Sequence, residues 1–451
     1  MTIYTNYKVK IREAHKAFAD TVEIYRQATD FFIDVCLKEW EAIAELSGLN
    51  RKSLVEKLTI KTSKNPAPKY PLPFYKMPSY LRRASIQEAL GKVASYKSNL
   101  ANWEANPLQN GRPPSKPQAG FVYPAMYRDN CFVRTDTYTA RLKVFIRNTW
   151  DWIDVDLKKT DVDYIQRHCK SRRECVPTLR KRGKNWFLDF AFEEKVDLQS
   201  KPIREQIVLS VDLGINNACT CSAMTSDGTV IGRKFLQLPR EKDCLWHWLN
   251  KMKKAQQHGA KRMPRMWARA KGLNQDIARK TAQFIVDVAH LFHADVIVFE
   301  HLNRSGKKRG SKKQRLHHWK SQTVQAIVTN KAHRAGMRIS RICAWNTSKL
   351  AFDGSGVVER DSKNYSICTF KTGKVYNCDL SASYNIGARY FIREILKSLP
   401  AMVRLDMEAK VPSCAKRTTC TLATLLSLNA GLASLLGTGF LSFAPYRGKA
   451  V

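Results

Sequence analysis

The hydrophobic pattern of residues 1–118 predicts one strand followed by helices. Apolar and polar residues alternate over residues 2–11, which is typical of a half-buried strand. From Ala14 to Ile43 apolar side chains recur at helical spacing, and residues 79–103 repeat this pattern. Glycine and proline mark residues 107–117 as a linker. We therefore expect a strand at 1–11 and an inserted helical region at 12–118.

The next segment, residues 119–204, changes to a period of two. Alternating runs at 138–146, 150–157 and 185–192 are separated by polar turns. Several short alternating strands joined by such turns are typical of a small β-barrel. We expect the strand at 1–11 to close this barrel across the helical insertion.

From residue 205 the pattern predicts an α/β core. The apolar run 207–211 reads as a buried strand that ends on Asp212, and strands at 218–224 and 229–235 follow it. The turn Ser226-Asp227-Gly228 would join the last two strands as a hairpin. A three-stranded meander with an acid at the end of its first strand is how an RNase H-like nuclease core begins.

Two further acids stand at comparable places. Helices at 242–257 and 274–292 lead to a second buried strand, 296–299, which ends on Glu300. A helix at 319–335, a strand at 337–343 and Asp379, just before a helix at 381–396, complete the pattern. We therefore expect a nuclease-like core in two parts, 205–342 and 379–400.

Asp212, Glu300 and Asp379 are the candidate catalytic residues. Mg²⁺ prefers carboxylate oxygen, and two such ions activate water and stabilise the leaving oxygen of a phosphodiester. A single acid at a strand end ordinarily faces a loop, but two such acids and a third before a helix favour a shared site. Transposases of the Asp-Asp-Glu type place the glutamate last. Here it is second, which points to a RuvC-like endonuclease.

The charge balance indicates a polyanionic partner. The chain has 451 residues with 77 Lys and Arg against 39 Asp and Glu, a net charge of +38. Such an excess destabilises a compact chain unless nucleic acid neutralises it, although a ribosome-associated or membrane-surface protein is an alternative. Residues 251–271 and 304–320 each hold eight basic residues and no acid. From these runs we take as nucleic-acid ligands Lys261, Arg262, Arg265, Lys307, Lys308, Arg309, Lys312, Lys313, Arg315 and, as a stacking residue, Trp319.

Two features bear on the compartment. The twelve cysteines form no compact framework and the N-terminus carries no apolar signal, so we expect reduced thiols in a prokaryotic cytoplasm. Residues 418–446 are uncharged and long enough for a membrane span, but Thr, Ser, Asn and Gly dilute them. We predict a tail at 401–451 whose apolar helix, near 422–436, packs on protein, with no membrane partner.

Three motifs around the acids carry a family resemblance. Residues 211–216 (VDLGIN), 298–303 (VFEHLN) and 379–386 (DLSASYNI) resemble the three RuvC motifs of TnpB, the RNA-guided nuclease of insertion sequences, and of the compact type V CRISPR effectors. Ser381 stands where the third motif usually has Asn. Residues 319–348 are similar to the family's run into its zinc ribbon.

The resemblance implies an α+β multidomain protein. Its parts would be a wedge-type barrel (1–11 and 119–204), a helical recognition lobe (12–118), a RuvC-like nuclease domain and a ribbon-like insertion at 343–378. It also implies a guide RNA, a double-stranded DNA target beside a short motif, and two Mg²⁺ ions, replaceable by Mn²⁺, on the three acids. A monomer is favoured over a homodimer. Tyr80, Arg83 and Gln87 share one helix face and suit the reading of that DNA.

The ribbon departs from the family pattern. The family has two Cys-x-x-Cys pairs there, but Ala351, Gly354 and Lys371 occupy three of the four places and Cys368 alone remains. Cys343 and Cys378 lie nearby at other spacings. Since a structural zinc needs four ligands, we expect no structural zinc.

The sequence thus predicts an RNA-guided, Mg²⁺-dependent DNA endonuclease that cuts at a single RuvC site. Two alternatives remain open. One is a nuclease-silent or weakly active RNA-guided regulator that only binds DNA. The other is an RuvC-type resolvase that uses no RNA.

Overall fold

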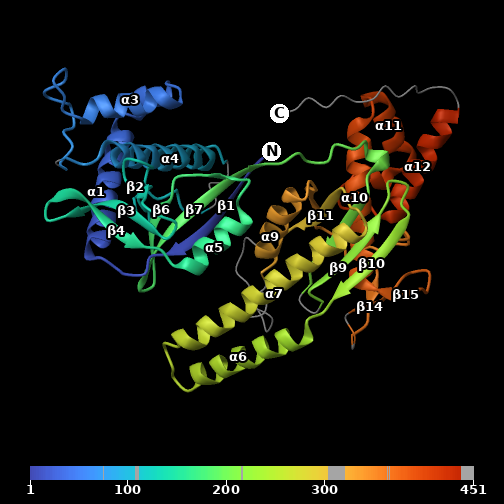
Figure 1. Ribbon diagram of the computed structural model, residues 1–451. Coiled ribbons are helices and arrows are strands. Elements are labelled where there is room, and N and C mark those ends of the chain that lie inside the picture. Colours follow the sequence, from blue (N-terminus) through green and yellow to red (C-terminus); the bar gives the residue numbers. More distant parts are fainter. Residues whose placement is uncertain are drawn as a thin grey trace. The chain divides into compact units, whose positions relative to one another are not determined.

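The computed structural model describes residues 1–437 except Tyr75, 107–110, 215–216, 303–319, Lys363 and Tyr365. The chain divides into two compact units, one of residues Thr2–Lys195 and one that runs from Val196 and includes Met1 (Figure 1). Each unit combines helices with sheets, so the predicted mixed α+β multidomain class is confirmed.

The N-terminal unit contains two antiparallel sheets. The strands of the first, in chain order, are β1 (Thr2–Lys10), β5 (Arg173–Glu174), β6 (Thr178–Arg182) and β7 (Asn185–Lys195). Those of the second are β2 (Phe132–Arg134), β3 (Thr139–Ile146) and β4 (Thr149–Asp156). A single bridge, between Ile11 and Leu157, links their ends. Over the described residues these strands do not close, so the predicted closed barrel is wrong; the sheets share one core instead.

The helices of this unit are α1 (Lys16–Lys38), α2 (Trp40–Ala44), α3 (Gly48–Thr59), α4 (Ser79–Glu104) and α5 (Lys159–His168). The long helices α1 and α4 pack on each other, and α1 also packs on β3. His15 caps α1 by accepting a hydrogen bond from Ala17 N at 3.1 Å. Helix α5 was not predicted, because its buried apolar side chains are only Val162 and Ile165 and it interrupts a strand-rich segment.

The C-terminal unit is built on one five-stranded sheet in the order β10-β9-β8-β11-β12. These strands are β8 (Val208–Asp212), β9 (Cys219–Met224), β10 (Val230–Leu236), β11 (Val296–His301) and β12 (Arg338–Cys343). The first three form the predicted antiparallel meander, whereas β11 is parallel to both β8 and β12. The predicted strand order around the acids is therefore present.

The sheet is covered on one face by α7 (Pro264–Leu291) and α9 (Ser321–Arg334) and on the other by α10 (Cys378–Ser398). Helix α6 (Pro239–Gln257) packs on α7, α12 (Leu422–Gly437) packs on α10, and α11 (Ala401–Lys410) packs on α12. Leu209 and Val211 face a core shared with α7 and α9, whereas Val208 faces a core shared with α10 and α12. Burial on both faces explains why β8 and β11 read as continuous apolar runs.

Helix α10 approaches the sheet closely through small residues. A Cβ added at Gly387 would lie 3.2 Å from Ser210 Oγ and 3.3 Å from Met224 Sδ. The hydroxyls of Ser222 and Ser383 are 2.5 Å apart, which joins β9 to the helix. These contacts hold the N-terminal half of α10 against β8 and β9.

The apolar C-terminal segment forms α12, at the place predicted from the sequence. Its residues Leu422, Leu425, Leu428 and Leu432 are buried in the core shared with α10. No helix in the described part of the chain has the length and apolar character needed to cross a membrane.

Residues 343–378 form a small ribbon of three antiparallel strands, β13 (Glu359–Arg360), β14 (Ile367–Thr369) and β15 (Val375–Asn377). It has its own core of Ala351, Val358, Cys368, Phe370 and Cys378, with Phe352 and Tyr376 packed against it. Phe370 is thus part of this core, and Phe352 contacts it from outside.

Candidate active site

The register of two parallel strands places Asp212 beside Glu300. Val211 of β8 pairs with Phe299 of β11, and each acid is the next residue along its strand. Because parallel strands run in the same direction, both carboxylates reach the carboxyl edge of the sheet. Both strands are buried up to the residue before the acid, so each acid is the first polar residue at this edge of the sheet.

The third acid comes from the first turn of α10. Asn377 caps this helix by accepting a hydrogen bond from Leu380 N at 2.9 Å. Asp379 Oδ2 accepts a hydrogen bond of 2.6 Å from Asn217 Nδ2, which lies just before β9. The partial positive charge of a helix N-terminus also stabilises a carboxylate there. Asn217 and the helix cap therefore fix Asp379 near the end of β8.

The three acids act on one another electrostatically. Burial, and then the charges of Glu300 and Asp379, raise the pKa of Asp212 well above its usual range, while Arg360 opposes this shift. Burial also raises the pKa of Glu300, against the hydrogen bond from Thr347 and the charge of Arg389. The structure thus brings the three predicted residues into one electrostatic cluster.

The carboxylates of this cluster are the type of ligand that a divalent cation requires. Carboxylate oxygens are the ligands that Mg²⁺ and Mn²⁺ prefer, and a cation relieves the repulsion that raises the pKa of Asp212. Within the described ranges no three Asp, Glu, His or Cys side chains lie close enough together to hold an ion. Thr347 and Asn217 instead hold Glu300 and Asp379 by hydrogen bonds.

Several residues that support the acids were missed by the sequence analysis. Asn385 Nδ2 donates to the carbonyls of Thr347 (3.0 Å) and Leu350 (2.9 Å), so α10 holds the loop that presents Thr347 to Glu300. Arg389, buried and one turn further along α10, donates to the carbonyl oxygens of Cys343, Trp345, Thr418 and Cys420. The sequence signal that could have identified these residues is a pair of polar side chains, Asn385 and Arg389, at i and i+4 on the buried face of α10.

Arg360 of the ribbon was also missed. Its guanidinium donates to the carbonyl of Ser348 at 3.1 Å. Its positive charge opposes the rise in the pKa of Asp212 that burial and the other two acids cause. Nothing in the sequence distinguishes this arginine from the other basic residues of the chain, because only the folded ribbon brings it near β8.

Two buried hydroxyls at the cluster have no hydrogen-bond partner within the described part of the chain. One is Ser381, at the position where the family motif has Asn, and the other is Thr220, the residue paired with Asp212 on β9. Buried polar groups are normally satisfied, so these two are available to a bound water or ligand.

The predicted nucleic-acid ligands lie in both units. Tyr80, Arg83 and Gln87 lie on α4, where Tyr80 packs on Tyr127 and Arg83 Nε is 3.0 Å from Glu56 Oε1. Lys261, Arg262 and Arg265 are exposed at the α6–α7 connection and the start of α7. The predicted ligands that fall outside the described residues are Lys307, Lys308, Arg309, Lys312, Lys313, Arg315 and Trp319.

Comparison with known proteins finds a TnpB-like relative of this chain. A protein described as "TnpB-like protein aq_aa05", from Aquifex aeolicus (strain VF5), is 28% identical over 234 residues, which cover 46% of this chain and 74% of that protein. The predicted resemblance to TnpB-like proteins is thereby confirmed. The structure of a "mini-RNA-guided endonuclease CRISPR-Cas_phi3" is similar in fold, with a TM-score of 0.50 and 10% identity over 85% of this chain and 92% of that one.

The family assignment comes from the N-terminal part. Residues 3–146 match the model of the Aq_aa04 family. The uncharacterized protein aq_aa04 of Aquifex aeolicus (strain VF5) is 34% identical over 146 residues, which cover 27% of this chain and 82% of that protein. The chain belongs to the Aq_aa04 family.

Proposed function

We propose that this chain is an RNA-guided, Mg²⁺-dependent DNA endonuclease with one active site at Asp212, Glu300 and Asp379. The parallel register that sets Asp212 beside Glu300, with Asp379 in the same electrostatic cluster, carries this proposal. The name of the TnpB-like relative and the fold shared with a protein described as an RNA-guided endonuclease support it.

Mg²⁺ bound by the three carboxylates would supply an activated water and neutralise charge on the leaving oxygen. The chain's own contribution is to hold the ligands in place. The Thr347 hydroxyl orients Glu300, the Asn217 amide orients Asp379, and Asn385 fixes the loop that carries Thr347. Arg360 adds a positive charge near Asp212 that suits a phosphodiester.

The remaining parts take the roles that the resemblance implies. The N-terminal unit would hold the guide RNA, with 1–11 and 119–204 as the wedge and 12–118 as the recognition lobe. Residues 205–342 and 379–400 would form the RuvC-like domain, 343–378 the degenerate ribbon and 401–451 the tail. The net charge of +38 fits RNA and double-stranded DNA as partners. Tyr80, Arg83 and Gln87 would read the motif beside the target.

The full-length protein tests this proposal directly. RNA that copurifies with the chain is sequenced, its guide segment is replaced, and a DNA library with randomised flanks is offered with Mg²⁺. We expect cleavage only of targets that match the new guide, beside a fixed short motif. Loss of flank preference in Gln87→Ala, with cleavage retained, would assign motif reading to α4.

The same assay separates the two alternatives. Guided DNA binding without cleavage by the wild-type chain would identify a nuclease-silent regulator. Cleavage that does not depend on any copurified RNA would identify an RNA-independent resolvase. Either result overturns the proposal.

A further inference from the structure

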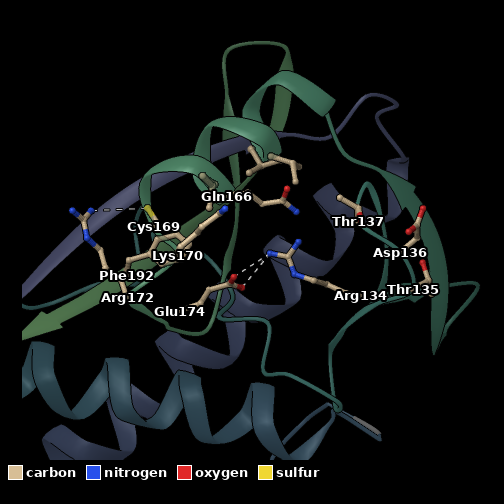
Figure 2. Close-up of a pocket in the computed structure, with 13 residues that line it drawn as sticks. Arg134, Thr135, Asp136, Thr137, Gln166, Cys169, Lys170, Arg172, Glu174 and Phe192 are labelled. Atoms are coloured by element: carbon tan, nitrogen blue, oxygen red, sulfur yellow. Dashed lines mark hydrogen bonds and ion pairs between the residues drawn. The ribbon is translucent and has the colours of Figure 1, made fainter.

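The N-terminal unit contains a cavity of about 590 Å³ that no part of the proposed reaction uses (Figure 2). Gln166 of α5 and Lys170, in the turn just after that helix, line one side, and the turn after β2 lines the other with residues 135–137. Val9, Val162 and Phe192 add apolar surface. This volume lies within the range of sites for a single small ligand or nucleotide and is too small for a duplex.

The planar guanidinium of Arg134 lines this cavity and is positioned by two contacts. Its Nη2 lies 3.2 Å from each carboxylate oxygen of Glu174, and its guanidinium lies 5.0 Å from the ring centre of Phe190. Figure 2 shows Arg134 directed into the pocket between Glu174 and the turn that carries Thr137. A guanidinium fixed in this way offers a plane on which a base can stack.

Two carboxylates line the cavity, Glu174, which is paired with arginines, and Asp136, which is exposed in the turn after β2, against the cations Arg134, Lys170 and Arg172. Glu174 accepts both Arg134 and Arg128, the latter at 2.8 Å. Arg172 Nε lies 2.9 Å from Glu194 Oε2. Lys170 is exposed, and among the described residues no carboxylate forms an ion pair with it. The cavity therefore keeps a cation for an anionic ligand.

The other polar side chains suit the edge of a base. Gln166, near the end of α5, carries an amide that both donates and accepts hydrogen bonds, and Lys170 follows four residues later in the turn after the helix. Figure 2 shows Gln166 and Lys170 among the side chains that line the pocket. Thr137, on the opposite side, adds a hydroxyl. A plane, a hydrogen-bonding edge and one cation are together complementary to a nucleotide.

We propose that this cavity takes one unstacked nucleotide of the guide RNA, with its base on the Arg134 guanidinium, its edge at Gln166 and its phosphate at Lys170. This inference rests on the proposed function, because it assumes that the N-terminal unit holds RNA. RNA is favoured as the source because its loops and bulges present unstacked bases that proteins capture by stacking.

The test uses the full-length chain with its copurified RNA. Lys170→Ala should weaken RNA binding and lower the salt dependence of log K by about 0.7, the value for one single-stranded phosphate contact. Arg167→Ala is the matched control, because it removes an equal charge from an exposed residue of α5, three positions before Lys170, that does not line the cavity. Arg134→Lys keeps the charge but loses the stacking plane, so it should weaken binding roughly tenfold.

Chemical probing then locates the nucleotide. We expect one base to be protected in the wild-type complex and reactive in Gln166→Ala, with the other bases unchanged. An abasic substitution at that nucleotide should weaken binding to the wild-type chain by more than it weakens binding to Gln166→Ala and Arg134→Lys.

The outcomes are distinguishable. If no RNA binds the wild-type chain, the proposed function fails. If RNA binds but Lys170→Ala matches Arg167→Ala and no single base changes its reactivity, this inference alone is wrong. If free AMP, GMP, CMP or UMP binds the RNA-free chain tightly and Lys170→Ala abolishes this while RNA binding is unaffected, the cavity serves a free nucleotide and the inference is also overturned.

Discussion

The chain has two places where the TnpB-like pattern implies metal ligands, and the two differ. At the carboxyl edge of the large sheet all three acids are kept, although burial and mutual repulsion raise the pKa of Asp212. In the ribbon three of the four cysteine positions are replaced, by Ala351, Gly354 and Lys371. The sheet edge therefore keeps an unfavourable cluster of negative charges. The ribbon has residues other than cysteine at three of the four positions where zinc ligands would stand.

In the ribbon, packing and hydrogen bonds connect the segments that carry these replaced cysteine positions. Ala351 is buried with Phe370 and Cys368, and the ring of Phe352 lies 5.4 Å from that of Phe370. Asp353 accepts hydrogen bonds from Ser355 (2.7 Å) and Thr372 (3.3 Å), which joins the two turns where the cysteine pairs would stand. If the ribbon holds no structural zinc, as we predict, contacts of this kind would supply the stability that the ion otherwise provides.

The difference follows from what each metal would do. A structural zinc contributes only folding free energy, so apolar side chains can take its place. Carboxylates that hold a catalytic ion cannot be exchanged in this way, because the chemistry depends on them. On the proposed function, the acids stay at the sheet edge despite the raised pKa of Asp212 because they would hold the catalytic ion.

The largest expected effect is at the sheet edge. Removal of any of the three acids, as in Asp212→Ala, Glu300→Ala or Asp379→Ala, should lower guided cleavage by roughly 10³-fold or more, since several kcal/mol of charge stabilisation are lost. Guided DNA binding should remain, as measured by gel shift. Asp243→Asn, an exposed acid on α6, is the control and should cut normally. Near-normal cutting by any of the three alanine variants would show that the site is misassigned.

The ribbon should respond to loss of packing rather than to loss of a ligand. Phe370 is buried, so Phe370→Ala should destabilise the ribbon by about 3–5 kcal/mol. Hydrogen exchange should show faster exchange across β14 and β15, and the exposed Val375→Ala should not change it.

Elemental analysis completes that comparison. We expect less than one zinc per chain and no change in Cys368→Ala. One tightly held zinc that Cys368→Ala removes would mean that the ribbon keeps a metal after all.

A smaller effect is expected where a neutral side chain positions an acid. Thr347→Val removes the hydrogen bond to Glu300, and a hydrogen bond to a charged group contributes about 1.5–3 kcal/mol. Guided cleavage should fall roughly tenfold to a hundredfold. Thr347→Ser keeps the hydroxyl and should retain most of the rate. Equal losses in Val and Ser would point to packing of the loop instead.

The smallest effect is on stability and has the opposite sign. Asp212→Asn removes a buried charge, so it should stabilise the metal-free protein by about 0.5–2 kcal/mol. A carboxyl whose pKa is higher in the folded state loses folding stability as pH rises, so the gain should be larger at about pH 8 than at about pH 5. Thermal unfolding measures it; a variant less stable than the wild type at both pH values would contradict the prediction.

The sequence predicted the large sheet well because its signals are local. Continuous apolar runs at β8 and β11 follow from burial on both faces, and their terminal acids mark the sheet edge. The helix predicted near 422–436 is present as α12, since its leucines recur every few residues in one uncharged segment. Periodicity is sufficient where an element carries its own pattern.

Long-range features were not predictable in this way. Whether strands such as β1 and β4 close a barrel depends on pairing partners far apart in the chain, and the described strands stop at one bridge. Arg360 reaches the acids only through the folded ribbon, and Thr347 only through the loop that Asn385 holds. No local pattern marks such residues.

The central claim is that Asp212, Glu300 and Asp379 bind a divalent cation together. Electron paramagnetic resonance of Mn²⁺ measures it most directly, as the number of ions that the chain with its copurified RNA and target DNA removes from solution. We expect the Glu300→Gln complex to bind fewer Mn²⁺ ions than the wild-type complex with the same RNA and DNA. The Asp243→Asn complex should bind as many Mn²⁺ ions as the wild type. Equal Mn²⁺ retention by wild type and Glu300→Gln would contradict it.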